Sequence, residues 1–308
     1  LVCALIAALL APTDAALGQA VISNPLVPER VRNGITVESG LNDGLALPLI
    51  LLLASLVVGM DERSGTDWAL FGIEQVVFGA VAGIVIGMAG ALLLLFCKAR
   101  RLTSETYEGV GAIALAGSAY AFALVVGGNG FISAFVAGLA FGSQVRGKCK
   151  FVYEFVESDG QLLVWMAFFL LGVALLPGAL AALDLRIALA IFVSLVVVRP
   201  LAVWLALTKS EASGLTRLFF GWFGPRGLAT ALFALLVVEE VGEPWSATVL
   251  AVAINAVWIS ALLHGVSAAP AAKAYARATE AMGDSAENME MPESLHDRGK
   301  APQSGDAA

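Results

Sequence analysis

The chain has 308 residues, of which 59% are hydrophobic and only 14% are charged, and its mean hydropathy is +0.84. Soluble domains carry about a quarter charged residues, so this composition excludes a soluble globular protein. The formal net charge of −7 says little about the apolar part, because the acidic residues are concentrated in the C-terminal tail and a few loops.

The sequence lacks the motifs of common membrane proteases and ATP-driven pumps. It contains no HExxH, GxSxG, P-loop or GxGxxG pattern, and its three cysteines show no CxxC spacing. We therefore expect an all-α polytopic membrane protein that is not an enzyme and has no nucleic-acid partner.

The first predicted element is a membrane span over residues 1–23. It is interrupted at Pro12, Thr13 and Asp14. A signal peptide is the alternative, but the segment has no initiator Met and no basic region before its apolar core. We expect that further spans precede it in the complete protein.

The next elements are apolar stretches long enough to cross a bilayer about 30 Å thick. They lie at 34–58, 69–97, 108–143, 160–180, 185–208, 215–240 and 246–266. The stretch 108–143 reads as two spans broken at "GGNG" (127–130), which brings the expected total to about nine. Composition changes near Pro270, so we predict a transmembrane domain over 1–269 and a disordered tail over 270–308.

Loop charges predict the orientation of these spans. Every second loop is basic, and the loops between them are acidic or neutral. The basic positions are Arg30, Arg32, Lys98, Arg100, Arg101, Arg146, Lys148, Lys150, Lys209, Arg217, Lys273 and Arg277. We therefore expect the basic loops and the C-terminal tail to be cytoplasmic.

Five charges remain at membrane depth once the loops are assigned. They are Asp14, Glu38, Asp43, Arg199 and Arg226. Asp43 lies roughly 13 Å into its span, near the midplane of the bilayer. Three acids and two bases do not cancel, so one acid is left to bind a cation or a proton. Asn255 and His264 in the last span are expected to form hydrogen bonds between helices rather than to bind ions.

Helical spacing groups the polar residues of the second span. Ser39 and Asp43 are four residues apart and share one face, and Glu38 and Asn42 share an adjoining face. One face can present a hydroxyl and a carboxylate to an ion, while the other can tie Glu38 to a basic partner. The alternative is that both acids form internal ion pairs that only hold helices together.

Two spans contain helix-breaking residues near mid-membrane. "LLAPTDAALG" (9–18) interrupts the first span, and "FFGWFGPRGLAT" (219–230) places glycines and a proline around Arg226. Unwound backbone at this depth is tolerated where it lines protein or a cavity. A pair of interrupted helices indicates the central site of a transporter, and Asp14 and Arg226 could offset the partial charges of the half-helix ends. Simple proline kinks are the alternative.

Five segments together resemble the monovalent cation:proton antiporter family, in the branch of the sodium/proton exchangers. They are "APTDAAL" (11–17), "VESGLNDGLALP" (37–48), "FVAGLAFG" (135–142), "VVVRPLAVW" (196–204) and "GWFGPRGLAT" (221–230). The resemblance implies that Asp43 binds the ion and carries the proton. It also implies that Ser39 and Thr13 are cation ligands through side chain or backbone, and that Asp14 lies where the unwound helices cross.

The same resemblance assigns supporting roles. It implies that Glu38 pairs with Arg199, that Asn42 lies beside the ion-binding aspartate, and that Arg226 supports the site. In this family an Asn-Asp pair accompanies electroneutral exchange, so Asn42-Asp43 predicts one cation per proton. The expected substrate is Na⁺, with K⁺ or Li⁺ as alternatives, and the expected role is pH homeostasis without any cofactor besides the transported ions.

The resemblance further implies an inverted-repeat antiporter fold that lacks its first spans, because family members have twelve or thirteen. It predicts a homodimer at full length, embedded in a bacterial plasma membrane. The chemistry agrees, because one buried carboxylate can hold H⁺ or a small hard cation but not both. The alternative functions are a passive channel, and a non-transporting scaffold or inactive fragment of such a transporter.

Overall fold

The computed structural model describes residues 1–58, 65–145, 148–281 and 287, and within these ranges all regular structure is helical. The elements are α1 (Val2–Leu9), α2 (Gln19–Ile22), α3 (Glu29–Val58), α4 (Gly65–Ala99), α5 (Glu105–Val125), α6 (Gly130–Val145), α7 (Lys150–Ala181), α8 (Leu185–Val193), η1 (Ser194–Val198), α9 (Arg199–Ala206), η2 (Leu207–Lys209), α10 (Gly214–Trp222), α11 (Leu228–Val241) and α12 (Trp245–Glu280). The predicted all-α fold is confirmed.

The two predicted interruptions are present. The first span divides at the segment between Leu9 and Gln19, and the segment 215–240 divides between Trp222 and Leu228. Within the described ranges, six helices are long and apolar enough to cross a membrane, and α6 and α11 are shorter apolar helices. The total of nine spans stays a prediction.

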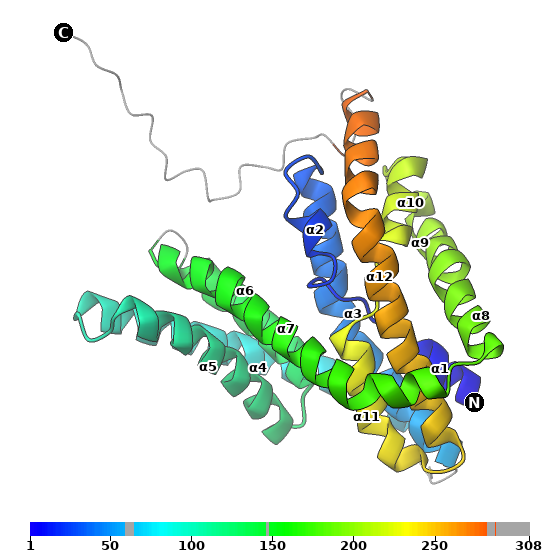
Figure 1. Cartoon of the computed structure of the whole chain (residues 1–308). Coiled ribbons are helices and arrows are strands. Elements are labelled where there is room, and N and C mark those ends of the chain that lie inside the picture. The colour runs from blue at the N-terminus through cyan, green and yellow to red at the C-terminus, as the bar shows by residue number, and fades with distance from the viewer. Residues whose placement is uncertain (59–64, 146–147, 282–286, 288–308) are drawn as a thin grey trace.

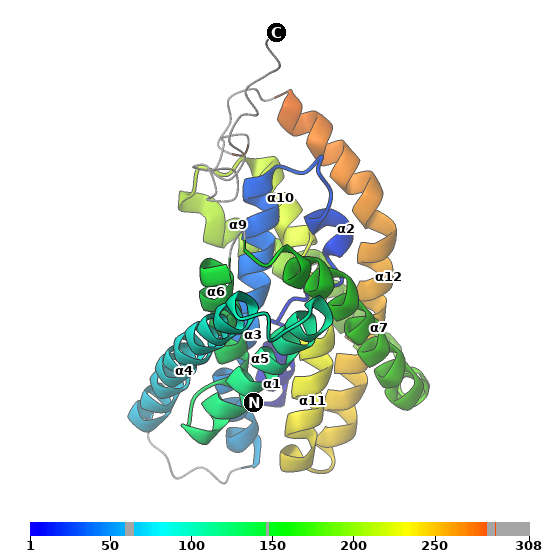
Figure 2. The same ribbon diagram turned by 90° about the vertical axis from the view of Figure 1, so that its left-hand side faces the viewer.

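The long helix α3 runs through the middle of the molecule (Figures 1 and 2). On one side of it α4, α5 and α6 form a group, and α8, α9, α10 and α12 lie on the other side (Figure 1). Helices α1 and α11 pack against α3 and against each other. This central position makes α3 a neighbour of both broken helices and of α6.

Apolar side chains occupy both the interior and much of the outer surface. The interior cluster includes Leu5 of α1, Ile50 of α3, Phe233 of α11 and Val249 of α12, all at most 1% exposed. On the outside, Phe169 of α7 is 68% exposed. Lipid rather than water would cover such a surface, as expected for a membrane protein.

The last helix corrects the predicted start of the tail at residue 270. Helix α12 continues through Pro270 to Glu280, so residues 270–280 are helical. The reason is packing: Tyr275 is 2% exposed and stacks on Phe219 of α10 with ring centroids 4.0 Å apart, and Ala272 is fully buried beside them. Most of the predicted tail, residues 282–286 and 288–308, lies outside the described residues.

Candidate functional site

The two unwound segments meet each other directly. The backbone N–H of Asp14, in the break between α1 and α2, donates a 2.8 Å hydrogen bond to the carbonyl of Pro225, in the break between α10 and α11. Each proline interrupts its helix because it has no N–H and its ring clashes with the preceding turn. The crossing therefore joins the two half-helix pairs at one point.

Asp14 caps the start of α11. Its Oδ2 accepts a hydrogen bond of 2.9 Å from the N–H of Leu228, and its Oδ1 accepts one of 2.8 Å from the N–H of Ala16. A carboxylate at this position offsets the positive end of the helix dipole. A Cβ at Gly227 would overlap the Asp14 carboxylate, so this approach requires glycine there.

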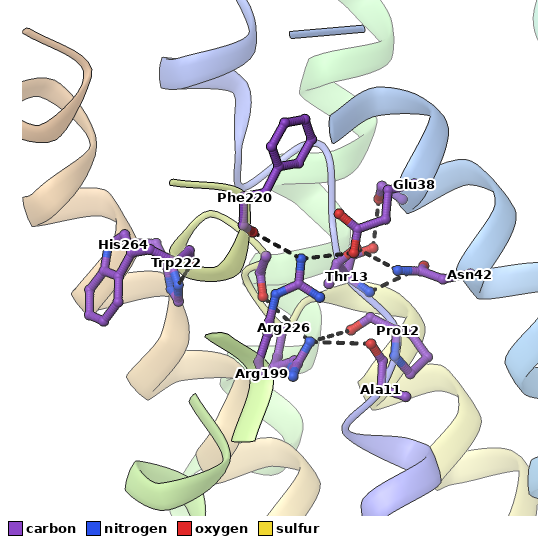
Figure 3. Close-up of polar contacts among 12 residues, drawn as sticks. Ala11, Pro12, Thr13, Glu38, Asn42, Arg199, Phe220, Trp222, Arg226 and His264 are labelled. Atoms are coloured by element: carbon purple, nitrogen blue, oxygen red, sulfur yellow. Dashed lines mark hydrogen bonds and ion pairs between the residues drawn. The ribbon is translucent and has the colours of Figure 1, made fainter. Parts of the chain in front are cut away.

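Arg226 lies at the other half-helix end of the crossing, the C-terminal end of α1. Its side chain is buried, and one guanidinium nitrogen donates to the carbonyls of Ala11 at 3.2 Å and Pro12 at 3.3 Å (Figure 3). These carbonyls follow the C-terminal end of α1, where a helix leaves acceptors without partners. The cation therefore lies at the negative end of α1, as the carboxylate of Asp14 lies at the positive end of α11.

Helix α12 holds the break between α10 and α11 from the side. The Ser260 hydroxyl accepts a 2.8 Å hydrogen bond from the N–H of Arg226, and Nε2 of His264 lies 2.8 Å from the carbonyl of Trp222. The prediction that His264 and Asn255 bond between helices is confirmed, since Asn255 donates to the carbonyl of Ala179 in α7 at 2.7 Å.

Ser260 is a site residue that was not predicted from the sequence. The available signal was its spacing of four residues from His264, which places both side chains on one face of a helix. Its hydroxyl is also 3.1 Å from Nδ1 of His264, so the two residues form one hydrogen-bonded unit. That spacing does not reveal that the unit faces Arg226.

The structure brings Glu38 of α3 and Arg199 of α9 together. Their side chains form an ion pair of 2.8 Å, and Arg199 also lies 3.4 Å from the carbonyl of Phe220 (Figure 3). A π-helical turn, η1, directly precedes Arg199. Such single-turn insertions are frequent at functional sites. A Cβ on Gly224 would overlap the guanidinium of Arg199, so the broken helix approaches this pair through glycine.

A second set of polar contacts ties α3 to the first break. The Ser39 hydroxyl donates to the carbonyl of Thr13 at 2.6 Å, and Nδ2 of Asn42 donates to the Thr13 hydroxyl at 2.7 Å. The N–H of Thr13 donates in return to Oδ1 of Asn42 at 3.3 Å. Thr13 and Ser39 are buried, so these contacts fix the unwound backbone of the first break against α3.

Asp43 differs from the other predicted site residues. It lies one helical turn after Ser39, but no hydrogen bond joins its carboxylate to Ser39 or Thr13 among the described residues. Its Oδ1 is buried without a hydrogen-bond partner in this part of the chain. A carboxylate in such surroundings is costly unless a proton or a cation neutralises it.

Comparison with known proteins gives one family. The family model described as "Sodium/hydrogen exchanger, transmembrane" matches residues 1–274. A protein named K(+)/H(+) antiporter NhaP2 from Shewanella sp. (strain ANA-3) is 30% identical over 279 residues, which cover 87% of this chain and 46% of that protein. A K(+)/H(+) antiporter NhaP from Alkalimonas amylolytica is 29% identical, with the same coverage.

More distant similarities point the same way. A probable Na(+)/H(+) antiporter of Schizosaccharomyces pombe is 28% identical over 76% of this chain and 32% of its own length. The solved structure of the sodium proton antiporter MjNhaP1 from Methanocaldococcus jannaschii has the same fold, with a TM-score of 0.71 and 20% identity over 88% of this chain and 70% of that one. The chain spans about half the length of the first two relatives.

Proposed function

We infer the function from one premise: this chain belongs to the sodium/hydrogen exchanger family, whose transmembrane model matches residues 1–274. The family is one of transporters, and the chain is a multi-pass integral membrane protein. We propose that the protein exchanges a monovalent cation for H⁺ across the membrane by alternating access. The sequence favours Na⁺, and the names of two relatives specify K⁺.

The observation that carries the proposal is the unpartnered carboxylate oxygen of Asp43. The other charges at this depth have partners in the described part of the chain. Glu38 pairs with Arg199, Asp14 accepts backbone N–H groups, and Arg226 donates to backbone carbonyls. This leaves the carboxylate of Asp43 as the group that a proton or a cation neutralises.

The proposed coupling follows from competition for one carboxylate. A proton and a cation cannot occupy the same oxygen atoms, so each displaces the other when the site faces one side of the membrane. We assign Ser39 and Thr13 as further ligands, because their oxygens lie on the neighbouring turn and the adjoining break, and hard cations prefer oxygen. With Asn42 beside a single ion-binding carboxylate, one H⁺ exchanges for one cation and the cycle is electroneutral.

The test is a flux measurement on protein expressed from the complete gene. It is reconstituted in liposomes with an acidic interior and a pH-sensitive dye, and Na⁺, K⁺ or Li⁺ is added outside. If the protein exchanges cations for H⁺, the liposome lumen becomes alkaline when one or more of these cations is added. Asp43→Asn is expected to abolish this change in dye signal. Glu211→Gln is the matched control, because it removes an exposed carboxylate in the loop before α10.

Three results would contradict the proposal. Flux that survives Asp43→Asn would remove the assigned carrier. Absence of flux with every cation, from folded protein, would favour a non-transporting scaffold. Cation current without H⁺ movement would instead indicate a channel.

We also propose the setting in which the exchanger works. Alternation of basic and non-basic loops supports a cytoplasmic C-terminus, and the bacterial relatives support a location in a bacterial plasma membrane. The transmembrane exchange domain would extend to the end of α12, followed by the tail. A homodimer at full length is part of the same proposal, and crosslinking in native membranes would test it.

A further inference from the structure

Asn129 lies where three helices meet and has no role in the site described so far. It precedes α6, and its side chain is 1% exposed. Its Oδ1 accepts hydrogen bonds from the N–H groups of Phe131 at 2.9 Å and Ile132 at 3.1 Å, so it caps the start of α6. Its Nδ2 donates a 3.1 Å hydrogen bond to the carbonyl of Gly44 in α3. One buried side chain therefore joins α6 to the helix that carries Asp43.

The carbonyl of Gly44 needs a donor from outside its own helix. In an α-helix the carbonyl of residue i accepts from the N–H of residue i+4, and here that residue is Pro48, which has no N–H. A buried carbonyl without a partner is costly, and Asn129 supplies the missing donor. Gly44 directly follows Asp43, so the bond fixes the backbone of α3 next to the ion-binding carboxylate.

Close packing holds α3 against α6 at the same place. A Cβ on Gly44 would overlap the side chain of Ile132, and a Cβ on Gly40 would overlap that of Phe135. The two glycines are four residues apart on one face, a spacing that lets membrane helices approach closely. Their side of α3 therefore lies directly on α6.

Asn129 is itself held from α4. Its N–H donates a 2.9 Å hydrogen bond to the carbonyl of Gln75, and a Cβ on Gly79 would lie 2.7 Å from its carbonyl oxygen. The amide that reaches Gly44 thus starts from a backbone fixed on α4 and α6. These contacts fix the amide of Asn129 relative to α4 and α6, on the side of α3 that carries Gly44.

We propose that Asn129 is a positioning residue for cation exchange. By bonding the carbonyl that Pro48 leaves unpaired, it sets the position of Asp43 relative to α4 and α6. This role rests on the proposed function, because it acts through the carboxylate of Asp43. Loss of the amide donor weakens cation binding, whereas loss of the cap alone affects only the stability of α6.

The first experiment tests the hydrogen bond by a double-mutant cycle on thermal stability in detergent. Asn129→Ser keeps a good helix cap, but its side chain is too short to reach Gly44. Asn129→Asp is the second variant: it keeps the size of the side chain and the cap but lacks the amide donor. Pro48→Ala restores the N–H that can pair with the carbonyl of Gly44 inside α3. We expect Asn129→Ser to lower the melting temperature more in the Pro48 background than in the Pro48→Ala background. Equal losses in both backgrounds would overturn the inference.

The second experiment measures exchange in liposomes against cation concentration. We expect Asn129→Ser to raise the half-saturating cation concentration about threefold to tenfold, the ratio that one net hydrogen bond provides, with the maximal rate within about twofold. Asp184→Ser, at the cap of α8, is the matched control and leaves the half-saturating concentration unchanged.

The outcomes separate this inference from the proposed function. An unchanged half-saturating concentration in Asn129→Ser, with exchange intact, would overturn the positioning role alone. Absence of exchange in the wild-type protein would overturn the proposed function, and the positioning role with it. The melting temperatures would still decide whether the hydrogen bond forms.

Discussion

Glu38 and Arg199 form an ion pair, and removing either partner should destabilise the protein. The loss of stability should differ between the two substitutions. The side chain of Arg199 is 8% exposed, whereas that of Glu38 is 32% exposed. Glu38→Gln leaves a buried cation without its counter-charge. Arg199→Gln leaves a carboxylate with access to the surface. We therefore expect Glu38→Gln to be the more destabilising substitution.

The magnitude follows from the 2.8 Å separation of the charged atoms. At an effective dielectric constant of about 20, two unit charges at this distance attract each other by roughly 6 kcal/mol. Desolvation of both ions offsets a large part of this attraction, and the exposure of Glu38 screens it further. We expect a loss of about 3 kcal/mol for Glu38→Gln, about 2 kcal/mol for Arg199→Gln, and a coupling energy of about 1–3 kcal/mol between them.

The assay is reversible unfolding in mixed detergent micelles, applied to both single variants and the double variant. Glu211→Gln is the control, because the pair of Glu211 with Arg30 is 4.0 Å long and exposed on both sides. It should cost about 0–1 kcal/mol. If Glu38→Gln costs no more than this control, or if the two single effects add without coupling, the ion pair does not hold α3 to α9.

Three further predictions concern the crossing and Glu287, which follows α12. Asp14→Asn removes the charge at the positive end of α11 and should lower the free energy of unfolding by about 0.5–2 kcal/mol, measured in the same micelles; an unchanged value would contradict the capping role. Ser260→Ala removes the acceptor for the N–H of Arg226 and should cost about 1–3 kcal/mol, whereas a cost below about 0.5 kcal/mol would mean that α12 does not hold the break. Burial alone would raise the pKa of Glu287, but hydrogen bonds from the start of α10 outweigh it and lower the pKa from 4.5 to about 2. Its stabilising effect is therefore complete above pH 4.5 and lost as the pH falls toward 2, so the melting temperatures of wild type and Glu287→Gln should converge below pH 4.5 and differ by a constant amount between pH 5 and 8.

Local sequence carried enough information to predict the helices and their breaks. A long apolar run that crosses a bilayer is predicted to be helical, because a helix pairs every backbone polar group within the segment. Pro12 stands beside Thr13 and Asp14, and Pro225 stands among glycines, so both interruptions could be predicted without knowledge of the fold, whereas the isolated Pro48 leaves α3 continuous. The end of the last helix was missed, because Ala272 and Tyr275 are ordered by contacts with α2 and α10 rather than by local hydropathy.

The partners of polar atoms could not be predicted in the same way. Inside α3, Pro48 leaves the carbonyl of Gly44 without a donor, and the partner that supplies one, Asn129, lies 85 residues after Gly44. Ser260 reaches the N–H of Arg226 across 34 residues. Hydropathy orders the spans along the chain but does not say which faces meet, so such contacts became visible only in three dimensions.

The charges at the crossing explain why one carboxylate can control the site. Glu38 and Arg199 neutralise each other, while Asp14 and Arg226 lie at half-helix ends of opposite polarity, each next to partial charges of opposite sign to its own. The net charge of the crossing is then that of Asp43. Under the proposed exchange, the site is neutral when it holds a proton or one monovalent cation and negative when it holds neither. A negative site is costly to move through a low-dielectric barrier, so the neutral, loaded forms are the ones that cross. In the proposed exchange, the coupling of cation and proton fluxes would therefore follow from the burial of one carboxylate among charges that are already balanced.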